Sequence, residues 1–292
     1  MSRRKTLLLA VPILPILACV SGAGSAGDAT SAAEPVGHVY ASPGGIDLKA
    51  YLFAPEDGAG NPRSAVLVFH GGGWSMGSAD WSFPKARHYA SRGVVGIAVQ
   101  YRISDEKDVT PLEAMADARE AVRWTRRNAS DLGIDPDRIA AFGWSAGAHL
   151  AACAAIFDTS STDTVSCSPD ALILSSPAVS LAGDGYVQRL LGSRARAEEI
   201  SPAAHVRPGM PPTFILQGRT DTVTPLAGTL RFHEAMIKAS NTCSLHVFNG
   251  VGHLFTPSDE PDDGWPNSDP ETSAEANRLA DAFLVSLGFM GN

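Results

Sequence analysis

At 292 residues, the chain is long enough for one large α/β domain or two small ones. Hydrophobic residues make up 44% and charged residues 18%, a balance that supports a packed core and excludes wholesale disorder. The formal net charge of -8 argues against nucleic acid as a partner, because an acidic surface repels phosphates.

Residues 1–18 are predicted to be an export signal that does not belong to the fold. Basic residues at positions 3–5 precede an apolar stretch that contains prolines and is too short to span a membrane. The stretch ends at Cys19 in a sequence that resembles a lipobox, although cleavage among residues 21–33 is the alternative. Residues 19–35 are predicted to be a flexible tether. The protein is therefore expected to be secreted, periplasmic or tethered to the membrane through Cys19.

A single catalytic domain is expected over residues 36–292, where short apolar segments alternate with amphipathic ones. The continuous apolar run from Ala65 to His70 is typical of a strand that is buried on both faces of a parallel sheet. The other predicted strands are Val39 to Ala41, Ile46 to Ala54, Val94 to Tyr101, Arg138 to Phe142, Ala171 to Ser175, Thr213 to Gln217 and Leu245 to Phe248. The predicted helices are Pro84 to Arg92, Leu112 to Ala129, Ala146 to Phe157, Leu226 to Ala239 and Pro270 to Leu287. This alternation predicts an open, mostly parallel sheet with helices on both faces.

Residues 178–211 lack a long periodic segment and are expected to form a small cap over the site, with a short helix near residues 186–191. The cysteines that follow the tether, Cys153, Cys167 and Cys243, are odd in number, which leaves at least one thiol unpaired. A bridge between Cys153 and Cys167 is left open. The sequence contains no C-x-x-C motif or His/Cys cluster, so neither a metal nor a cofactor is expected.

The segment Gly143–Gly147 matches the G-x-S-x-G motif and has the flanks that this motif requires. A buried strand precedes it and an alanine-rich helix follows. A serine on such a tight turn needs small neighbours, and glycine supplies the room. The turn directs the Ser145 hydroxyl out of the sheet, which makes Ser145 the candidate nucleophile.

Two residues in later segments complete the chemistry that a serine nucleophile needs. Asp221 follows the strand that ends at Gln217, and His253 follows the strand that ends at Phe248. A serine hydroxyl is a poor nucleophile at neutral pH, so a histidine must take its proton and a carboxylate must orient that histidine. The order Ser, Asp, His along the chain is the order of α/β-hydrolase triads. As an alternative, Asp221 is a turn residue and His253 a loop histidine.

The glycine run after the first buried strand, at residues 71–73, supplies a candidate oxyanion hole. Attack on a carbonyl creates an oxyanion that preorganised N–H groups must meet. The predicted donors are the N–H groups of Gly72, Gly73 and Ala146. Trp74, which ends the glycine run, and Trp144, which precedes the nucleophile, are the expected substrate contacts.

Two further features have competing interpretations. His149 lies one helical turn beyond Ser145, but the helix carries it away from the hydroxyl, so we interpret it as a packed residue or as one that supports the site residues from behind. The acidic segment Thr256 to Pro270 lies next to His253 and is either a rim of the substrate site or a solvated loop. The solvated loop is the preferred interpretation.

These motifs resemble the bacterial α/β-hydrolase esterases from about Val36 to the C-terminus. The likeness is greatest to hormone-sensitive-lipase-like and feruloyl/acetylxylan-type carboxylesterases. The residues that carry it are His70–Trp74, Tyr101-Arg102, Asp135–Ile139, Gly143–Ala151, Asp221 and Gly252-His253. The resemblance implies an α/β-hydrolase fold with a mostly parallel sheet and a small cap. It also implies a serine carboxylesterase that hydrolyses short acyl or aryl esters, including acetylated or feruloylated carbohydrate, through an acyl-enzyme without a cofactor.

The chain departs from these esterases in two places, because Trp144 fills a position that is often smaller or more polar and Ala148 replaces a common glycine. An amide hydrolase, either a peptidase or a formamidase, uses the same triad and stays open as an alternative. A non-catalytic binding protein on this scaffold is the second alternative. The sequence leaves the oligomeric state and the acyl and alcohol specificity open.

Overall fold

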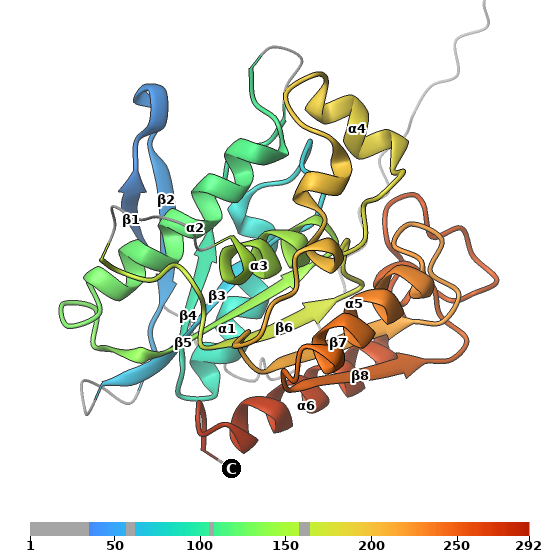
Figure 1. Cartoon of the computed structure of the whole chain (residues 1–292). Helices are drawn as coiled ribbons and strands as arrows, with labels where there is room; N and C mark the ends of the chain where they lie inside the picture. Colours follow the sequence, from blue (N-terminus) through green and yellow to red (C-terminus); the bar gives the residue numbers. More distant parts are fainter. Residues whose placement is uncertain (1–34, 57–61, 105–107, 158–163, 292) are drawn as a thin grey trace, which may run out of the picture. The chain divides into compact units, whose positions relative to one another are not determined.

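The computed structural model describes residues 35–56, 62–104, 108–157 and 164–291 (Figure 1). The predicted export signal, Cys19 and nearly all of the predicted tether lie outside the described residues.

An eight-stranded sheet forms the centre of the domain, with the strand order β1-β2-β4-β3-β5-β6-β7-β8. The strands are β1 (Val36–Ala41), β2 (Leu48–Phe53), β3 (Arg63–Phe69), β4 (Val95–Val99), β5 (Ile134–Trp144), β6 (Ala171–Ser175), β7 (Thr213–Gly218) and β8 (Cys243–Phe248). β2 pairs antiparallel with β1 and β4, and every pair from β4 to β8 is parallel. The predicted α/β fold with a mostly parallel sheet is thereby confirmed.

β3 shows why the central strands are apolar along their whole length. Val66 and Val68 pack into one core layer, whereas Leu67 and Phe69 pack into the other, and all four are fully buried. Successive side chains of a strand point to opposite faces, so a strand covered on both sides needs apolar residues at every position.

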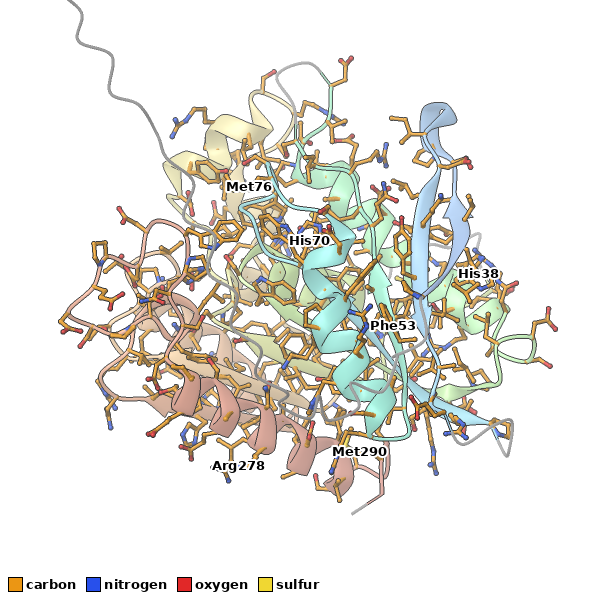
Figure 2. The ribbon with its side chains drawn as sticks, turned by 180° about the vertical axis from the view of Figure 1, so that it is seen from behind. His38, Phe53, His70, Met76, Arg278 and Met290 are labelled. Carbon is orange, nitrogen blue, oxygen red and sulfur yellow. The ribbon has the colours of Figure 1, made fainter. Side chains whose placement is uncertain are left out.

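Helices cover both faces of the sheet. The helices are α1 (Phe83–Ser91), α2 (Pro111–Arg127), α3 (Ala146–Ile156), α4 (Gly185–Leu191), α5 (Leu226–Lys238) and α6 (Pro270–Ser286). In Figure 1, α2, α3 and α5 lie in front of the sheet, and the view from behind in Figure 2 brings α1 and α6 to the front. α2 begins with a capping box, in which Thr110 accepts the N–H of Leu112 and Glu113 accepts the N–H of Thr110.

β5 begins earlier than the sequence predicted. Extended pairing starts at Ile134, which is in register with Arg63, and a register shift follows before Ala65 pairs with Ile139. The sequence predicts this strand only from Arg138, so the polar segment Asp135–Asp137 is an irregular first part that was not expected. Ile134 before this segment and Ile139 after it both pair with β3, and periodicity alone does not reveal such pairing.

Parallel pairing brings the carboxyl ends of the central strands to one edge of the sheet. The last residue of β3, Phe69, pairs with Gly143 near the end of β5. The segments that carry Ser145, Asp221 and His253 all leave the sheet at this edge. In an open α/β sheet, this is the edge at which reactive groups gather.

The segment between β6 and β7 forms the cap. It contains α4 and two 3-10 turns, Ala197–Ile200 and Pro202–Ala204. Asp184 caps α4 by accepting the N–H groups of Tyr186 and Val187. This agrees with the short helix expected near residues 186–191.

The described cysteines are buried. Cys153 is a reduced thiol, so the bridge between Cys153 and Cys167 that the sequence left open is not formed. Burial raises the pKa of the Cys243 thiol to about 12. Within the described ranges, no helix has both the length and the apolarity needed to cross a membrane.

Candidate active site

Ser145 occupies a sharp turn between β5 and α3. Its backbone angles, φ 54° and ψ -121°, lie outside the regions that L-residues ordinarily adopt. Its N–H donates to the carbonyl of Ser175 at 3.0 Å, and its own carbonyl accepts the N–H groups of Ala148 and His149 in the first turn of α3. The neighbouring strand and the helix therefore hold this strained residue in place.

The structure brings together the three side chains that the sequence analysis selected as a triad. Ser145 Oγ lies 3.1 Å from His253 Nε2, and His253 Nδ1 lies 3.0 Å from Asp221 Oδ2. Both are hydrogen-bond distances, and all three residues are buried. With its Nδ1–H donated to Asp221, a neutral His253 presents the lone pair of Nε2 to the serine hydroxyl and can accept its proton.

The carboxylate of Asp221 is held by its own loop. Its Oδ1 accepts the N–H groups of Val223 at 3.0 Å and Thr224 at 2.7 Å. Its Oδ2 accepts hydrogen bonds from Gln217 Nε2 and Thr224 Oγ1, both at 2.8 Å. The sequence left open whether Asp221 is a turn residue or a partner of His253. The structure shows that the same carboxylate does both.

The glycine-rich loop after β3 carries backbone N–H groups with no partner. Gly72 and Gly73 have φ values of 109° and 56°, which glycine adopts without a Cβ clash. Within the described part of the chain, the N–H groups of Gly72, Gly73 and Ala146 have no hydrogen-bond acceptor. The N–H of Ala146 also lies at the positive end of the α3 dipole. These donors are available to a developing negative charge.

Side chains from both sides hold this loop. The ring of His70 stacks on Tyr101 at a centroid distance of 4.3 Å, and its Nδ1 lies 2.6 Å from the carbonyl of Gly71. The Tyr101 hydroxyl donates to the carbonyl of His70 at 2.8 Å. From the cap, the hydroxyl of Tyr186 donates to the carbonyl of Gly73 at 2.9 Å. The cap thus contacts the loop that carries the unpaired N–H groups.

His149 connects the glycine-rich loop to the cap. The indole N–H of Trp74 donates to His149 Nδ1 at 3.2 Å, and His149 Nε2 donates to the carbonyl of Ile200 at 2.8 Å. Burial lowers the pKa of His149 to about 4, against the opposing effect of the Ile200 hydrogen bond. A neutral, fully buried ring with both nitrogens bonded agrees with the interpretation of His149 as a packed residue.

Acid is expected to destabilise the fold through His70 and His149. Burial lowers both pKa values to about 4, whereas a histidine in the unfolded chain titrates near pH 6.5. Between these values the unfolded chain binds more protons, so the free energy of unfolding falls as the pH falls. The expected loss is about 3 kcal/mol for each histidine between pH 6.5 and 4. Urea unfolding across this range measures it, and a His149→Gln variant should show a shallower fall. Parallel curves for the two proteins would contradict the assignment.

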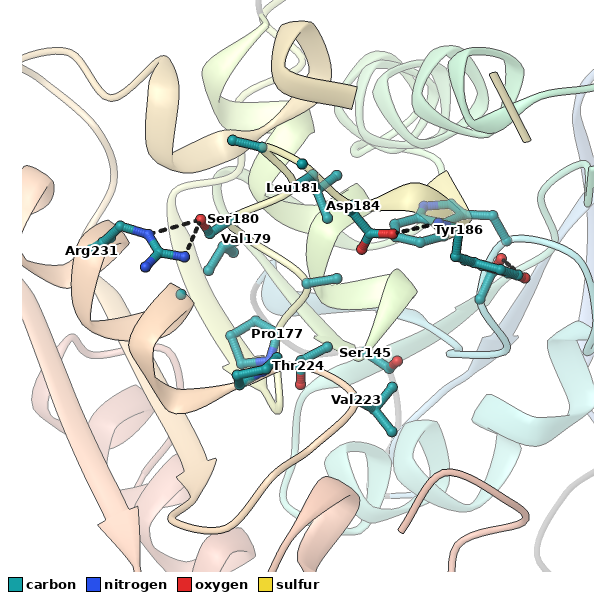
Figure 3. Close-up of a pocket in the computed structure, with 17 residues that line it drawn as sticks. Ser145, Pro177, Val179, Ser180, Leu181, Asp184, Tyr186, Val223, Thr224 and Arg231 are labelled. Atoms are coloured by element: carbon teal, nitrogen blue, oxygen red, sulfur yellow. Dashed lines mark hydrogen bonds between the residues drawn. The ribbon is translucent and has the colours of Figure 1, made fainter. Parts of the chain in front are cut away.

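A pocket of about 420 Å³ opens beside Ser145 (Figure 3). Tyr186 from the cap and Val223 from the Asp221 loop contribute to its lining. Arg231 lies at the opposite end of the lining from Tyr186, and its guanidinium donates to Ser180 Oγ at 3.0 Å. Small-molecule sites usually measure about 300–1,000 Å³, so this volume suits a small substrate group.

Of the two predicted substrate contacts, only Trp74 lies in the wall of this pocket. Trp144 lines a separate depression on the α1 and α6 side of the sheet, together with Lys85, Phe142 and Phe255. Alternation along β5 directs Phe142 and Trp144 to the same side. The strand therefore turns the Trp144 side chain away from the pocket beside Ser145. The prediction that Trp144 lines this pocket is wrong.

Asp262 is a residue of the site that the sequence analysis did not single out. The acidic segment Thr256 to Pro270 was interpreted as a solvated loop, but Asp262 is only 8% exposed and accepts the N–H of His253 at 2.7 Å. That interpretation was wrong for this residue. The sequence shows several carboxylates near His253, and nothing in it distinguishes Asp262 from Asp259 or Asp263.

Comparison with known proteins assigns the fold to a family. Residues 66–191 match a family model described as the alpha/beta hydrolase fold, and residues 180–263 match the prolyl oligopeptidase family. Thermogutta terrifontis esterase 2 is 34% identical with a TM-score of 0.79, and the alignment covers 90% of this chain and 98% of that one. This chain belongs to the α/β-hydrolase family.

Two curated relatives are longer than the region that matches this chain. The endo-1,4-beta-xylanase B of Butyrivibrio fibrisolvens is 30% identical over 218 residues, which are 70% of this chain and 34% of the xylanase. Carboxylesterase NlhH of Mycobacterium tuberculosis is 42% identical over 89 residues, which are 30% of this chain and 27% of that enzyme. The match therefore covers about a third or less of either curated relative. Structures of the Thermogutta esterase are described as phosphoramylated by tabun and as propionate bound.

Proposed function

We propose that this α/β-hydrolase is a serine carboxylic-ester hydrolase that works through an acyl-enzyme. Ser145 is the nucleophile, His253 is the general base and then the general acid, and Asp221 orients His253. The observation that carries the proposal is the pair of hydrogen bonds that joins these side chains, 3.1 Å from Ser145 Oγ to His253 Nε2 and 3.0 Å from His253 Nδ1 to Asp221 Oδ2. The Thermogutta relative, with its covalent organophosphate adducts, supports the same role for a serine.

The geometry supports a two-step reaction. Ser145 Oγ attacks the ester carbonyl carbon while its proton passes to His253 Nε2, and the resulting oxyanion accepts the N–H groups of Gly72, Gly73 and Ala146. When the intermediate collapses, the bond to the alcohol oxygen breaks and the alcohol takes the proton from Nε2. Water then attacks the acyl-enzyme and gives a proton to the same nitrogen. The bond from the acyl carbon to Ser145 Oγ breaks, Oγ takes the proton back from Nε2, and the acid leaves.

The wall of the pocket favours short acyl or aryl groups over long alkyl chains. Besides apolar residues it contains polar side chains, among them Ser180, Asp184 and Arg231. A long alkyl chain would take these charged groups out of water without pairing them, which costs free energy. A polyhydroxylated alcohol could bond to them instead, so an acetylated or feruloylated carbohydrate fits this wall. The xylanase relative supports the carbohydrate option.

A panel of 4-nitrophenyl esters tests the proposed activity. The kcat/KM for the acetyl and butyryl esters is expected to exceed that for the octanoyl ester by roughly 10-fold or more. The anilide of butyric acid is the matched amide, and feruloyl and acetylated xylo-oligosaccharide esters extend the panel. Equal or higher activity on the octanoyl ester would contradict the short-chain preference.

An amide hydrolase is the second candidate. The prolyl oligopeptidase match covers residues 180–263, which include Asp221 and His253. The same triad serves either reaction, so the ratio of ester to anilide hydrolysis decides between them. An anilide rate above the ester rate would favour the amide hydrolase.

We also infer that the protein is exported, with a membrane tether at Cys19 as one outcome. The support is the basic start, the apolar stretch and the lipobox-like end of residues 1–18. Mass spectrometry of the mature N-terminus separates a lipidated Cys19 from cleavage among residues 21–33, and an uncleaved chain would refute export.

A further inference from the structure

A second carboxylate contacts His253, through its backbone and not through its ring. Asp262 Oδ2 accepts the N–H of His253 at 2.7 Å and the N–H of Thr222 at 3.0 Å. Asp262 Oδ1 accepts the hydroxyl of Thr222. Although burial raises the pKa of Asp262, the hydrogen bonds from Thr222 and His253 hold it below its ordinary value, so the group is a carboxylate at neutral pH.

Gly252, the residue before His253, leaves room for the Asp262 carboxylate. A Cβ at Gly252 would lie 2.3 Å from Asp262 Oδ2, which is closer than any real contact. The backbone of Gly252, with φ -103° and ψ -138°, lies outside the extended and helical regions, which also favours glycine. A larger residue before His253 would in addition push the Asp262 carboxylate away.

Asp262 joins the two loops that carry the proposed acid–base pair. Thr222 directly follows Asp221, and His253 lies in the loop after β8, which ends at Phe248. The carboxylate thus fixes the backbone next to Asp221 and the backbone of His253 at the same time. Charge-assisted hydrogen bonds of this kind are shorter and stronger than neutral ones.

The loop beyond His253 needs such support because its backbone is strained. Leu254 and Phe255 have φ values of 50° and 67°, which are unfavourable for bulky L-residues. The N–H of Leu254 donates to Ser176 Oγ at 3.1 Å, and Asp262 holds the residue just before it. A strained loop that loses one of these anchors can relax and take the imidazole with it.

We propose that Asp262 is a positioning residue for the hydrolysis, one that sets the alignment of His253 with Asp221 and Ser145 through the two loop backbones. This inference rests on the proposed function. A shift of about 1 Å in a reacting group can cost about 100-fold in rate. Loss of Asp262 is therefore expected to lower kcat. Substrate binding is little affected, because Asp262 does not line the pocket beside Ser145.

The main experiment compares Asp262→Ala with Asp262→Asn on 4-nitrophenyl acetate. Asp262→Ala is expected to lower kcat about 100-fold with KM changed less than about threefold. An asparagine can turn its carbonyl oxygen to the two N–H groups and its amide to the Thr222 hydroxyl, so Asp262→Asn should stay within about fivefold of the native kcat. Asp263→Ala, a change to the exposed neighbouring carboxylate, is the matched control and should be neutral. Formate should partly restore the Asp262→Ala variant.

Active-site counting separates positioning from a merely structural role. Saturating fluorophosphonate counts the competent serines, and kcat is then expressed for each labelled site. A native kcat per labelled site in Asp262→Ala, with fewer sites labelled, would overturn the proposal. If Asp262→Ala does not fold, Thr222→Val is the second variant, because it removes one hydrogen bond to the same carboxylate. It should lower kcat several-fold, and an unchanged kcat would also overturn the proposal. If the native protein neither hydrolyses 4-nitrophenyl acetate nor reacts with the fluorophosphonate, the proposed function itself is refuted.

Discussion

Replacing Ser145 by alanine is expected to lower kcat/KM for short esters by about 10,000-fold or more and to abolish labelling by a fluorophosphonate. The proposed reaction forms a bond from Oγ to the acyl carbon, and alanine has no atom to form it. His253 and the N–H groups of Gly72 and Gly73 remain in the variant, but they only assist water, which is a much weaker catalyst than the bound alkoxide-like oxygen.

The same substitution should leave the fold intact. The Ser145 hydroxyl has one hydrogen-bond partner in the described structure, His253, and its removal frees no room for rearrangement. The free energy of unfolding should therefore change by less than about 1 kcal/mol. Ser175→Ala, which removes the hydroxyl at the end of the neighbouring strand, is the control and should keep its labelling. A folded Ser145→Ala protein that retains a tenth of the native rate would refute the nucleophile.

The fold was predictable where the pattern is local. Ala171–Ser175 is a strand with the predicted bounds, because a buried parallel strand is a short apolar run between polar ends. The start of β5 was not predictable in this way. Its residues Asp135–Asp137 are polar, and they belong to the strand because Ile134 before them and Ile139 after them pair with β3.

In the candidate site, too, the residues at strand ends were predictable and those placed by loop packing were not. Ser145, Asp221 and His253 each follow a strand, and parallel strands deliver their ends to one edge, so chain order and fold class together bring them close. Asp262 follows no strand and reaches His253 through the packing of one loop on another. Asp262 was missed, whereas Trp144 was wrongly included. Its nearness to Ser145 along the chain suggested a contact that the alternation of side chains along β5 prevents.

Replacing Gly147 by alanine is expected to destabilise the fold by roughly 3 kcal/mol or more. A Cβ at this position would lie 2.1 Å from the carbonyl oxygen of Phe69 and 2.4 Å from that of His70. Both atoms belong to the backbone at the end of β3 and cannot rotate out of the way. α3 would have to move away from the sheet, and because Ser145 is joined to its first turn, the nucleophile would move with it.

Urea unfolding of Gly147→Ala measures this cost, with Gly185→Ala as the matched control. Gly185 is also near the start of a helix, but a Cβ there meets nothing within 4 Å, so alanine should be neutral or stabilise α4 slightly. The folded fraction of Gly147→Ala should also lose activity, since the clash lies between β3, which leads into the predicted oxyanion loop, and α3, which carries the Ala146 donor. A Gly147→Ala protein with native stability and rate would show that α3 and β3 can move apart without cost. The close contact between them at Gly147 would then not be what holds Ser145 in its strained turn.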